Sequence, residues 1–470
     1  MNRARVQQAL LALFLLLGGL AAMYWAFGNY THRELSPSLL LAFWRLALLS
    51  FCAYAILRRS LTAWIIAGML LGAEIGRDFP VAAQNLQVLS AIFLRLIKTI
   101  VAPLIFGTLV VGIAGHADLK QVGRMGVKAL IYFEVLTTLA LLIGLAAANL
   151  SQAGAGVQKK PERTVAQATA APSPQPQKGT DIILHAFPEN IAKAVAEGQV
   201  LQVVVFSIIF AIALALLSEE KRRPMILFCE SLSEVMFKFT NIVMMFAPLA
   251  VLGAMAATIG SMGFEVLKSL VHLLVTLYAA LFVFLLFVLV PVALLARLPL
   301  KKLFRAVAEP VSIAFATASS EAALPRAMES MEAFGVPRQI VAFVMPTGYS
   351  FNLDGSTLYL SLASLFVAQA AGIHLSIGQQ VAMMLTLMLT SKGVAGVPRA
   401  MLVILSGTVD SFQLPMWPVL ILLGVDQLMD MGRTATNVLG NCLATAVVAR
   451  WEGALGTETP SATVLDATAE

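Results

Sequence analysis

The chain has 470 residues, of which 59% are hydrophobic and 12% are charged, and its formal net charge is +6. Its mean hydropathy is +0.85. These values exclude an ordinary soluble globular protein, and the short basic clusters between apolar runs exclude a nucleic-acid-binding surface. The composition predicts a polytopic, all-α membrane protein.

Two apolar runs open the chain. Residues 8–27 follow Arg3 and Arg5, and residues 38–57 end at Arg58 and Arg59. The first run is long for a signal peptide and has no convincing cleavage site after it, which favours a retained helix. We therefore expect residues 1–60 to form an extra membrane hairpin that begins and ends in the cytoplasm.

The next region, residues 61–150, contains three apolar segments. The third carries Glu134, Thr137 and Thr138. Because an acid inside a span is unfavourable, Glu134 indicates either a function or capping by nearby hydroxyls at the interface. Residues 151–182 are rich in Ala, Pro, Ser and Gln and are predicted to form a flexible extracellular linker.

Residues 183–305 resume the apolar pattern, with runs at 198–217, 235–258 and 266–297. The pattern then changes. Residues 309–325 are rich in small and hydroxyl side chains, and residues 383–405 contain the sequence TSKGVAGVP. Two short, interrupted segments of this kind predict re-entrant helical hairpins whose tips meet near the bilayer midplane.

A polar break interrupts the apolar stretch 345–369 that lies between these two segments. It reads Asn352-Leu353-Asp354-Gly355-Ser356. A carboxylate and an amide are unfavourable in lipid, so we expect them to face a cavity lined by protein. The break therefore predicts an ion or solute site.

The last span, residues 420–446, carries a polar stripe. Its members are Asp426, Asp430, Arg433, Asn437 and Asn441. Their three- and four-residue spacing places them on one helix face. Such a face is expected to line a cavity, and an internal salt-bridge stripe is the alternative. If an even number of spans separates each basic cluster from the next, all the basic clusters lie on the cytoplasmic side of the membrane. This arrangement predicts that both termini are cytoplasmic and that residues 456–470 form a disordered cytoplasmic tail.

Four motifs in this order resemble the dicarboxylate/amino acid:cation symporter family, which has the glutamate-transporter fold. They lie at residues 319–320, 352–356, 391–398 and 430–437, and the resemblance covers about residues 60–455. It implies eight family transmembrane helices plus two re-entrant hairpins, with residues 306–455 as the transport core. It also implies a homotrimer in which a mobile transport domain moves like an elevator against a central scaffold.

The resemblance also implies substrate-binding residues. Asp430 would receive the amino group of an acidic amino acid, and Arg433 would bind its side-chain carboxylate. The other members of the pocket would be Ser319, Ser320, Ser356, Val397, Thr434 and Asn437. A buried guanidinium needs an anion, which favours an acidic substrate over a neutral one. A C4-dicarboxylate is the nearest alternative, although it has no amino group for Asp430.

By the same resemblance, the coupling ion would involve a second set of residues: Thr137, Thr138, Gly348, Asn352, Asp354, Asn437 and Asn441. Sodium-coupled members commonly have an aspartate at the position of Asn441, so the neutral amide favours proton coupling. Asn352 and Asp354 keep the residue types of a second sodium site, and sodium therefore stays open.

The candidate proton carriers are Glu134, Asp354 and Glu321, because burial favours a protonated carboxyl. Glu321 could instead cap the first hairpin. We predict a symporter of the cell inner membrane that imports glutamate or aspartate with protons, without a cofactor. Alternatives are sodium coupling, a C4-dicarboxylate substrate, or an intramembrane hydrolase. The hydrolase would be built on Ser319 or Ser320 with Lys392, or on an aspartyl pair of Asp354 and Asp430. The hydrolase lacks a recognisable oxyanion arrangement, so we do not expect an enzyme.

Overall fold

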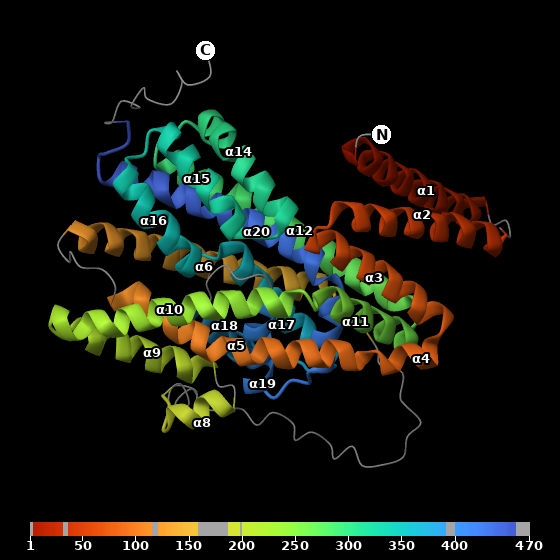
Figure 1. Cartoon of the computed structure of the whole chain (residues 1–470), viewed down its shortest axis with the longest axis horizontal. Helices are drawn as coiled ribbons and strands as arrows, with labels where there is room; N and C mark the ends of the chain where they lie inside the picture. Colours follow the sequence, from red (N-terminus) through yellow and green to blue (C-terminus); the bar gives the residue numbers. More distant parts are fainter. Residues whose placement is uncertain are drawn as a thin grey trace. The chain divides into compact units, whose positions relative to one another are not determined.

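The computed structural model describes residues 3–31, 36–114, 121–157, 187–197, 200–391 and 400–456. All regular secondary structure in these ranges is helical (Figure 1). Large apolar side chains such as Leu15, Val275 and Phe287 are exposed on the helices. Exposed apolar surface of this kind suits lipid rather than water. The predicted all-α membrane fold is therefore confirmed.

Several helical stretches are long and apolar enough to cross a membrane. Within the described ranges these are Arg3–Tyr24, Ser38–Arg58, Pro80–Val111, Met125–Ser151 and Glu265–Leu295. Helices α10 (Glu219–Met244) and α11 (Ala247–Met262) would add a sixth span if they are taken together, although they are bent by 50°. Two further apolar helices in the described ranges, Gln202–Ala215 and Ile377–Thr390, are shorter than a full span.

The chain divides into two compact units. The first comprises Met1–Phe93 and Val243–Phe264, and the second comprises Leu94–Ile242 and Glu265–Glu470. The first unit holds α1 (Arg3–Thr31), α2 (Pro37–Arg58), α3 (Leu61–Asp78), α4 (Pro80–Asn85) and α11. Every candidate site residue that the structure describes belongs to the second unit.

Small residues bring two helices of the first unit into backbone contact. Gly68, Gly72 and Gly76 of α3 face successive turns of α11, and a Cβ atom at Gly76 would lie only 2.6 Å from the carbonyl oxygen of Ala256. Glycines four residues apart leave a flat strip on which a second helix can lie closely. The pairing of α3 with α11 therefore depends on these glycines.

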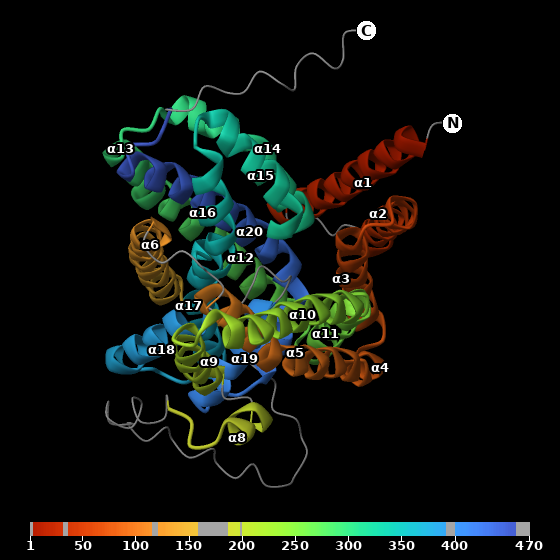
Figure 2. The same cartoon turned by 60° about the vertical axis from the view of Figure 1, so that its left-hand side comes forward.

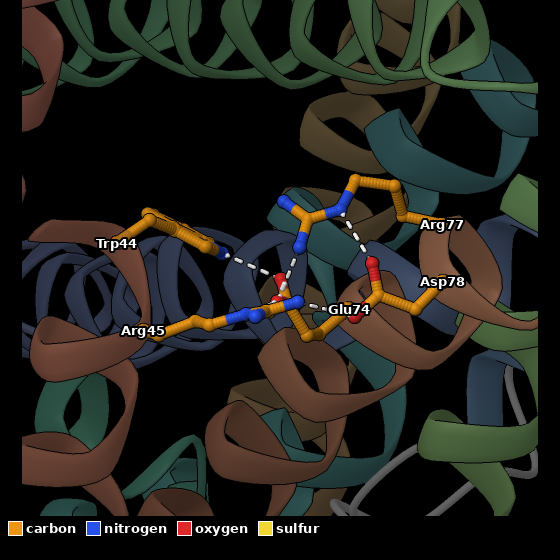
Figure 3. A network of polar contacts seen from close by, with 5 residues as sticks. All are labelled: Trp44, Arg45, Glu74, Arg77 and Asp78. Atoms are coloured by element: carbon orange, nitrogen blue, oxygen red, sulfur yellow. Dashed lines mark hydrogen bonds and ion pairs between the residues drawn. The ribbon is translucent and has the colours of Figure 1, made fainter. Parts of the chain in front are cut away.

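The extra N-terminal hairpin joins α3 through a polar network (Figure 3). Arg45 of α2 donates from Nε to Glu74 (2.8 Å) and from Nη2 to Asp78 (2.6 Å) on α3. Trp44 Nε1 also donates to Glu74 at 3.2 Å, while Arg77 pairs with both carboxylates. Two arginines and two carboxylates balance one another, so this network joins the hairpin to α3 without net charge.

The second unit contains the remaining elements. These are α5 (Gln87–Ala114), which begins in the first unit, and α6 (Gln121–Ser151), α8 (Ile191–Ala196), α9 (Val200–Ala215), α10, α12 (Glu265–Phe284), η1 (Leu285–Leu289), α13 (Val290–Leu295), α14 (Leu300–Thr317), α15 (Ser320–Phe334), α16 (Arg338–Phe351), α17 (Asp354–Ala370), α18 (Ile377–Thr390), α19 (Ala400–Ser411) and α20 (Trp417–Trp451). Nearly all of α17 is buried, and it contacts α6, α12, α18, α19 and α20.

The two predicted hairpins have different outcomes. Helices α14 and α15 lie side by side in both views and contact α20, so the first interrupted segment is a helical hairpin (Figures 1 and 2). Its turn is at Ala318, which adopts the left-handed conformation (φ 50°, ψ 37°). Helices α18 and α19 flank the second predicted tip and contact each other. That tip, at residues 392–399, lies outside the described residues, as do 158–186 and 457–470.

Two apolar runs differ from a plain span. The run 235–258 is divided between α10 and α11 at Met245 and Phe246. Pro248 follows the break at the start of α11, where its missing N–H is tolerated. The run 266–297 stays helical but includes the π-helical turn η1 just before Pro291. Proline cannot donate to the preceding turn, which accounts for the local change of hydrogen bonding.

Candidate substrate and ion site

The polar break predicted at residues 352–356 interrupts a helix. Helix α16 ends at Phe351 and α17 begins at Asp354, while Asn352 (φ −121°, ψ 69°) and Leu353 (φ −100°, ψ 56°) leave helical geometry. The backbone N–H of Asn352 still donates to Gly348 at 2.8 Å. Asp354 is fully buried in the first turn of α17. The break thus places the C-terminus of α16 and the N-terminus of α17 next to each other.

The polar stripe of α20 is buried, as its spacing predicted. Its members Asp426, Asp430, Arg433, Asn437 and Asn441 are each at most 5% exposed. They span just over four turns of one helix, so charge and amide groups are presented in a fixed order along one face. Thr434, on the same helix, is also buried and donates to Oδ1 of Asp430 at 3.1 Å.

Arg433 is the buried cation of the α20 stripe, with 1% of its surface exposed. Its Nε donates to Asp430 at 2.8 Å and its Nη1 to Asp426 at 3.1 Å. Its Cζ also lies 4.3 Å from the ring centre of Tyr359 on α17, in the geometry of a cation–π contact. Within the described residues, Nη2 of Arg433 is buried and has no hydrogen-bond partner. The guanidinium is therefore fixed in place with one pair of donors still available.

Helices α17 and α20 are joined by amide groups. Asn437 accepts from the backbone N–H of Ser356 at 3.2 Å and donates to the Ser356 hydroxyl at 2.8 Å. Asn352 donates from Nδ2 to Oδ1 of Asn441 at 3.1 Å. In the described part of the chain, Oδ1 of Asn352 and Nδ2 of Asn441 are buried without a partner. Buried polar atoms without partners are unfavourable, so these two are candidates for contact with a bound group.

Two glycines permit this close approach. A Cβ atom at Gly355 would lie 2.5 Å from the carbonyl oxygen of Arg433 and 2.9 Å from its Cα. A Cβ atom at Gly440 would lie 2.5 Å from Oδ2 of Asp354. Asp354 and Arg433 therefore belong to one contact between the broken helix and α20.

Helix α6 contributes a third side of the region. Thr137 is fully buried and Glu134 is partly buried. The hydroxyl of Thr138 donates to the carbonyl oxygen of Glu134 at 2.7 Å and lies 3.6 Å from the sulfur of Met388 on α18. The Thr138 hydroxyl is thus engaged within α6 and beside α18. Gly348 of α16 lies beside α20, next to the Asn441 side chain.

The residues predicted at the first hairpin tip have different environments. Ser320 is buried, whereas Ser319 is the N-cap of α15 and accepts from the backbone N–H of Ala322 at 3.2 Å. Glu321 is exposed in this chain. The helix cap is therefore Ser319, in place of the capping role considered for Glu321. Val397, predicted on the second tip, lies outside the described residues.

Sequence reasoning missed one residue of this region. Tyr359 lies three residues after Ser356 on α17, a spacing that places both on one face and could have marked it. Asp426 was recognised in the stripe but was not included among the substrate residues, although it is a partner of Arg433.

A broken helix, a helical hairpin and a buried charged stripe within an all-helical membrane protein define a transporter of small solutes. The model of the Sodium:dicarboxylate symporter family matches residues 61–451. The chain belongs to this family, whose members are cation-coupled symporters. Residues 1–60, which hold α1 and α2, precede the matched region.

Three curated relatives are similar over most of their length. The proton/glutamate-aspartate symporter of Escherichia coli (strain K12) is 44% identical over 398 residues, which are 83% of this chain and 91% of the relative. The proton/sodium-glutamate symport protein of Bacillus caldotenax is 42% identical, with coverage of 83% and 94%. The C4-dicarboxylate transport protein of Bacillus subtilis (strain 168) is 41% identical, with coverage of 84% and 94%.

Proposed function

We propose that the chain imports an acidic amino acid, glutamate or aspartate, together with protons. The observation that carries this proposal is the buried guanidinium of Arg433, whose Nη2 has no hydrogen-bond partner within the described residues. A guanidinium presents parallel donors to a carboxylate, and its Nε and Nη1 are already oriented by Asp430 and Asp426. The names of the relatives from Escherichia coli and Bacillus caldotenax agree with such a substrate.

In this proposal the substrate lies along α20. Its side-chain carboxylate binds Arg433 and its ammonium group binds Asp430. The hydroxyl and amide groups that complete the pocket are those of Ser319, Ser320, Ser356, Thr434 and Asn437, with the backbone at Val397 as the second hairpin's contribution. Closure of that hairpin over the bound solute would couple occupancy to movement of the transport domain.

Proton coupling is proposed from the chemistry of the broken helix. Asn441 pairs with Asn352 as a neutral amide, so this pair adds no negative charge that would neutralise a sodium ion. Asp354 is fully buried, and Glu134 is partly buried on α6. In this proposal the proton carrier is Asp354 at the helix break or Glu134 on α6. Glu321 is the weaker candidate because its side chain is exposed in this chain.

Two alternatives have specific support. Sodium coupling would use Asn352 and Asp354 with Thr137, Thr138, Gly348, Asn437 and Asn441, and the name of the Bacillus caldotenax relative includes both ions. A C4-dicarboxylate substrate agrees with the name of the Bacillus subtilis relative. That substrate has no ammonium group, so the negative charge of Asp430 distinguishes it from an amino acid.

The experiment compares uptake of labelled aspartate and succinate by wild-type protein and Asp430→Asn in proteoliposomes. The substitution keeps an oxygen for Arg433 and Thr434 but removes the charge. A charge-assisted hydrogen bond contributes about 1.5–3 kcal/mol, so the KM for aspartate should rise by about 10- to 150-fold while succinate uptake changes little. An equal loss for both substrates contradicts the amino-acid assignment. An imposed pH gradient, with and without sodium, separates the two coupling ions.

Assembly and orientation belong to the same proposal. The protein is proposed to be a homotrimer in the cell inner membrane, with both termini in the cytoplasm and the linker 151–182 outside. The even number of spans between basic clusters supports this orientation. Mass measurement of the purified protein and labelling of single cysteines introduced at the termini would test the two statements.

A further inference from the structure

Four arginines gather at one end of the extra N-terminal hairpin. Helices α1 and α2 pack side by side, and Nη2 of Arg3 donates to the carbonyl oxygen of Leu57 at 2.8 Å (Figure 1). The start of α1 therefore lies beside the end of α2. This arrangement brings Arg3 and Arg5 together with Arg58 and Arg59, and all four side chains are exposed.

The hairpin offers these arginines no counter-charge. The only acidic residue in the sequence before Glu74 is Glu34, which lies between the end of α1 and the start of α2. Glu74 and Asp78 of α3 are already paired with Arg45 and Arg77. Among the described residues, none of the four arginines makes an ion pair. A cluster of four positive charges is thus left for an external anion.

The backbone at the end of α2 positions the last arginine of the cluster. Arg59 closes α2 in the left-handed conformation, with φ 55° and ψ 26°, and its N–H donates to the carbonyl oxygen of Ala55. Glycine is the usual residue at such a position, because other L-residues incur about 1 kcal/mol there. This cap fixes the place of Arg59 at the end of α2, directly after Arg58.

The surface next to the cluster is apolar. Ile56 and Leu49 on α2, and Leu13 and Leu16 on α1, are exposed. A molecule that fits both parts carries a phosphate above hydrocarbon chains. Guanidinium groups match phosphate oxygens in geometry and charge, and anionic lipid attracts basic groups at the cytoplasmic face.

We propose that this end of the hairpin binds the headgroup of an anionic phospholipid, with the acyl chains along the exposed apolar side of α1 and α2. The phosphate lies among Arg3, Arg5, Arg58 and Arg59. A zwitterionic lipid brings its own cation and leaves the cluster uncompensated, so phosphatidylglycerol is bound in preference to phosphatidylcholine. This function belongs to residues that precede the region matched by the family.

The test measures binding of fluorescent phosphatidylglycerol and phosphatidylcholine to the full-length protein in detergent. The variant is Arg58→Gln/Arg59→Gln. The matched control is Lys301→Gln/Lys302→Gln, which removes two adjacent exposed charges from α14. Each arginine near an anionic surface contributes about fivefold in affinity, so the arginine variant should bind phosphatidylglycerol about 25-fold more weakly, and the control should bind like the wild type.

Three results would overturn the proposal. They are equal affinity of the wild type for the two lipids, an equal loss in the lysine control, and full displacement of the lipid by millimolar inorganic phosphate. The last would identify a site for free phosphate. Thermal unfolding without added lipid is measured in parallel. If Arg58→Gln/Arg59→Gln is unstable, Arg58→Lys/Arg59→Lys replaces it, and retained selectivity for phosphatidylglycerol in that variant supports the lipid site.

Discussion

The close contact between the broken helix and α20 can be tested by adding a single methyl group. In Gly355→Ala the new Cβ would lie 2.5 Å from the carbonyl oxygen of Arg433, 2.9 Å from its Cα and 2.9 Å from Cβ of Thr436. Two of these atoms belong to the α20 backbone, which cannot rotate away as a side chain can. The start of α17 must therefore move away from α20.

The expected free-energy change follows from that displacement. Overpacking costs about 1–3 kcal/mol, and the two hydrogen bonds between Ser356 and Asn437 contribute about 1 kcal/mol each. Alanine regains about 0.5–1 kcal/mol of helix propensity. The variant should thus lose roughly 2–4 kcal/mol of stability. Its glutamate uptake should fall as well, because Ser356 and Asn437 belong to the proposed pocket.

Thermal unfolding of purified protein and glutamate uptake into proteoliposomes provide the measurements. Gly378→Ala is the matched control, because Gly378 is also near the start of a helix and a Cβ atom there would meet nothing within 4 Å. The control should unfold at the same or a slightly higher temperature. If Gly355→Ala unfolds at the same temperature as Gly378→Ala and transports glutamate normally, α17 and α20 do not approach each other as described.

Two further predictions concern the same region. Tyr359→Leu removes the ring beneath the Arg433 guanidinium. Because a buried cation–π contact contributes about 1–2 kcal/mol, the KM for glutamate should rise by about 5- to 30-fold. Tyr359→Phe keeps the ring and should stay near wild type, and equal effects of the two variants would instead assign the contact to the hydroxyl. Asn441→Asp places a carboxylate beside Asn352, so uptake should gain a dependence on sodium; uptake that remains driven by a pH gradient alone would speak against a cation site there.

The sequence predicted the parts of this site that repeat with helical spacing or interrupt it. The stripe from Asp426 to Asn441 is buried as expected, and the helix breaks at Asn352 as expected. Both features are local, because a run of polar residues in an apolar chain is visible without knowledge of the fold. The first hairpin turn beside Ser319 was recognisable for the same reason.

Contacts between segments that are far apart in the chain could not be predicted from the sequence. The ring of Tyr359 lies on Arg433, 74 positions later, and a tyrosine in an apolar helix gives no sign of a partner so far away. Glu321 was considered as a buried proton carrier or as a cap of the first hairpin, but its side chain is exposed on α15. The break at Met245 was missed because the run 235–258 is apolar on both sides of it, so hydropathy did not change there.

The network of Arg45 with Glu74 and Asp78 has a consequence for biosynthesis. The ribosome makes α2 before α3, so the arginine is already in the translocon or the bilayer when the two acids emerge. With Arg77 as their partner within α3, Glu74 and Asp78 leave that helix with a net charge of −1, and Arg45 of α2 balances it. The order of synthesis therefore supplies the balancing cation before the acids of α3 are made.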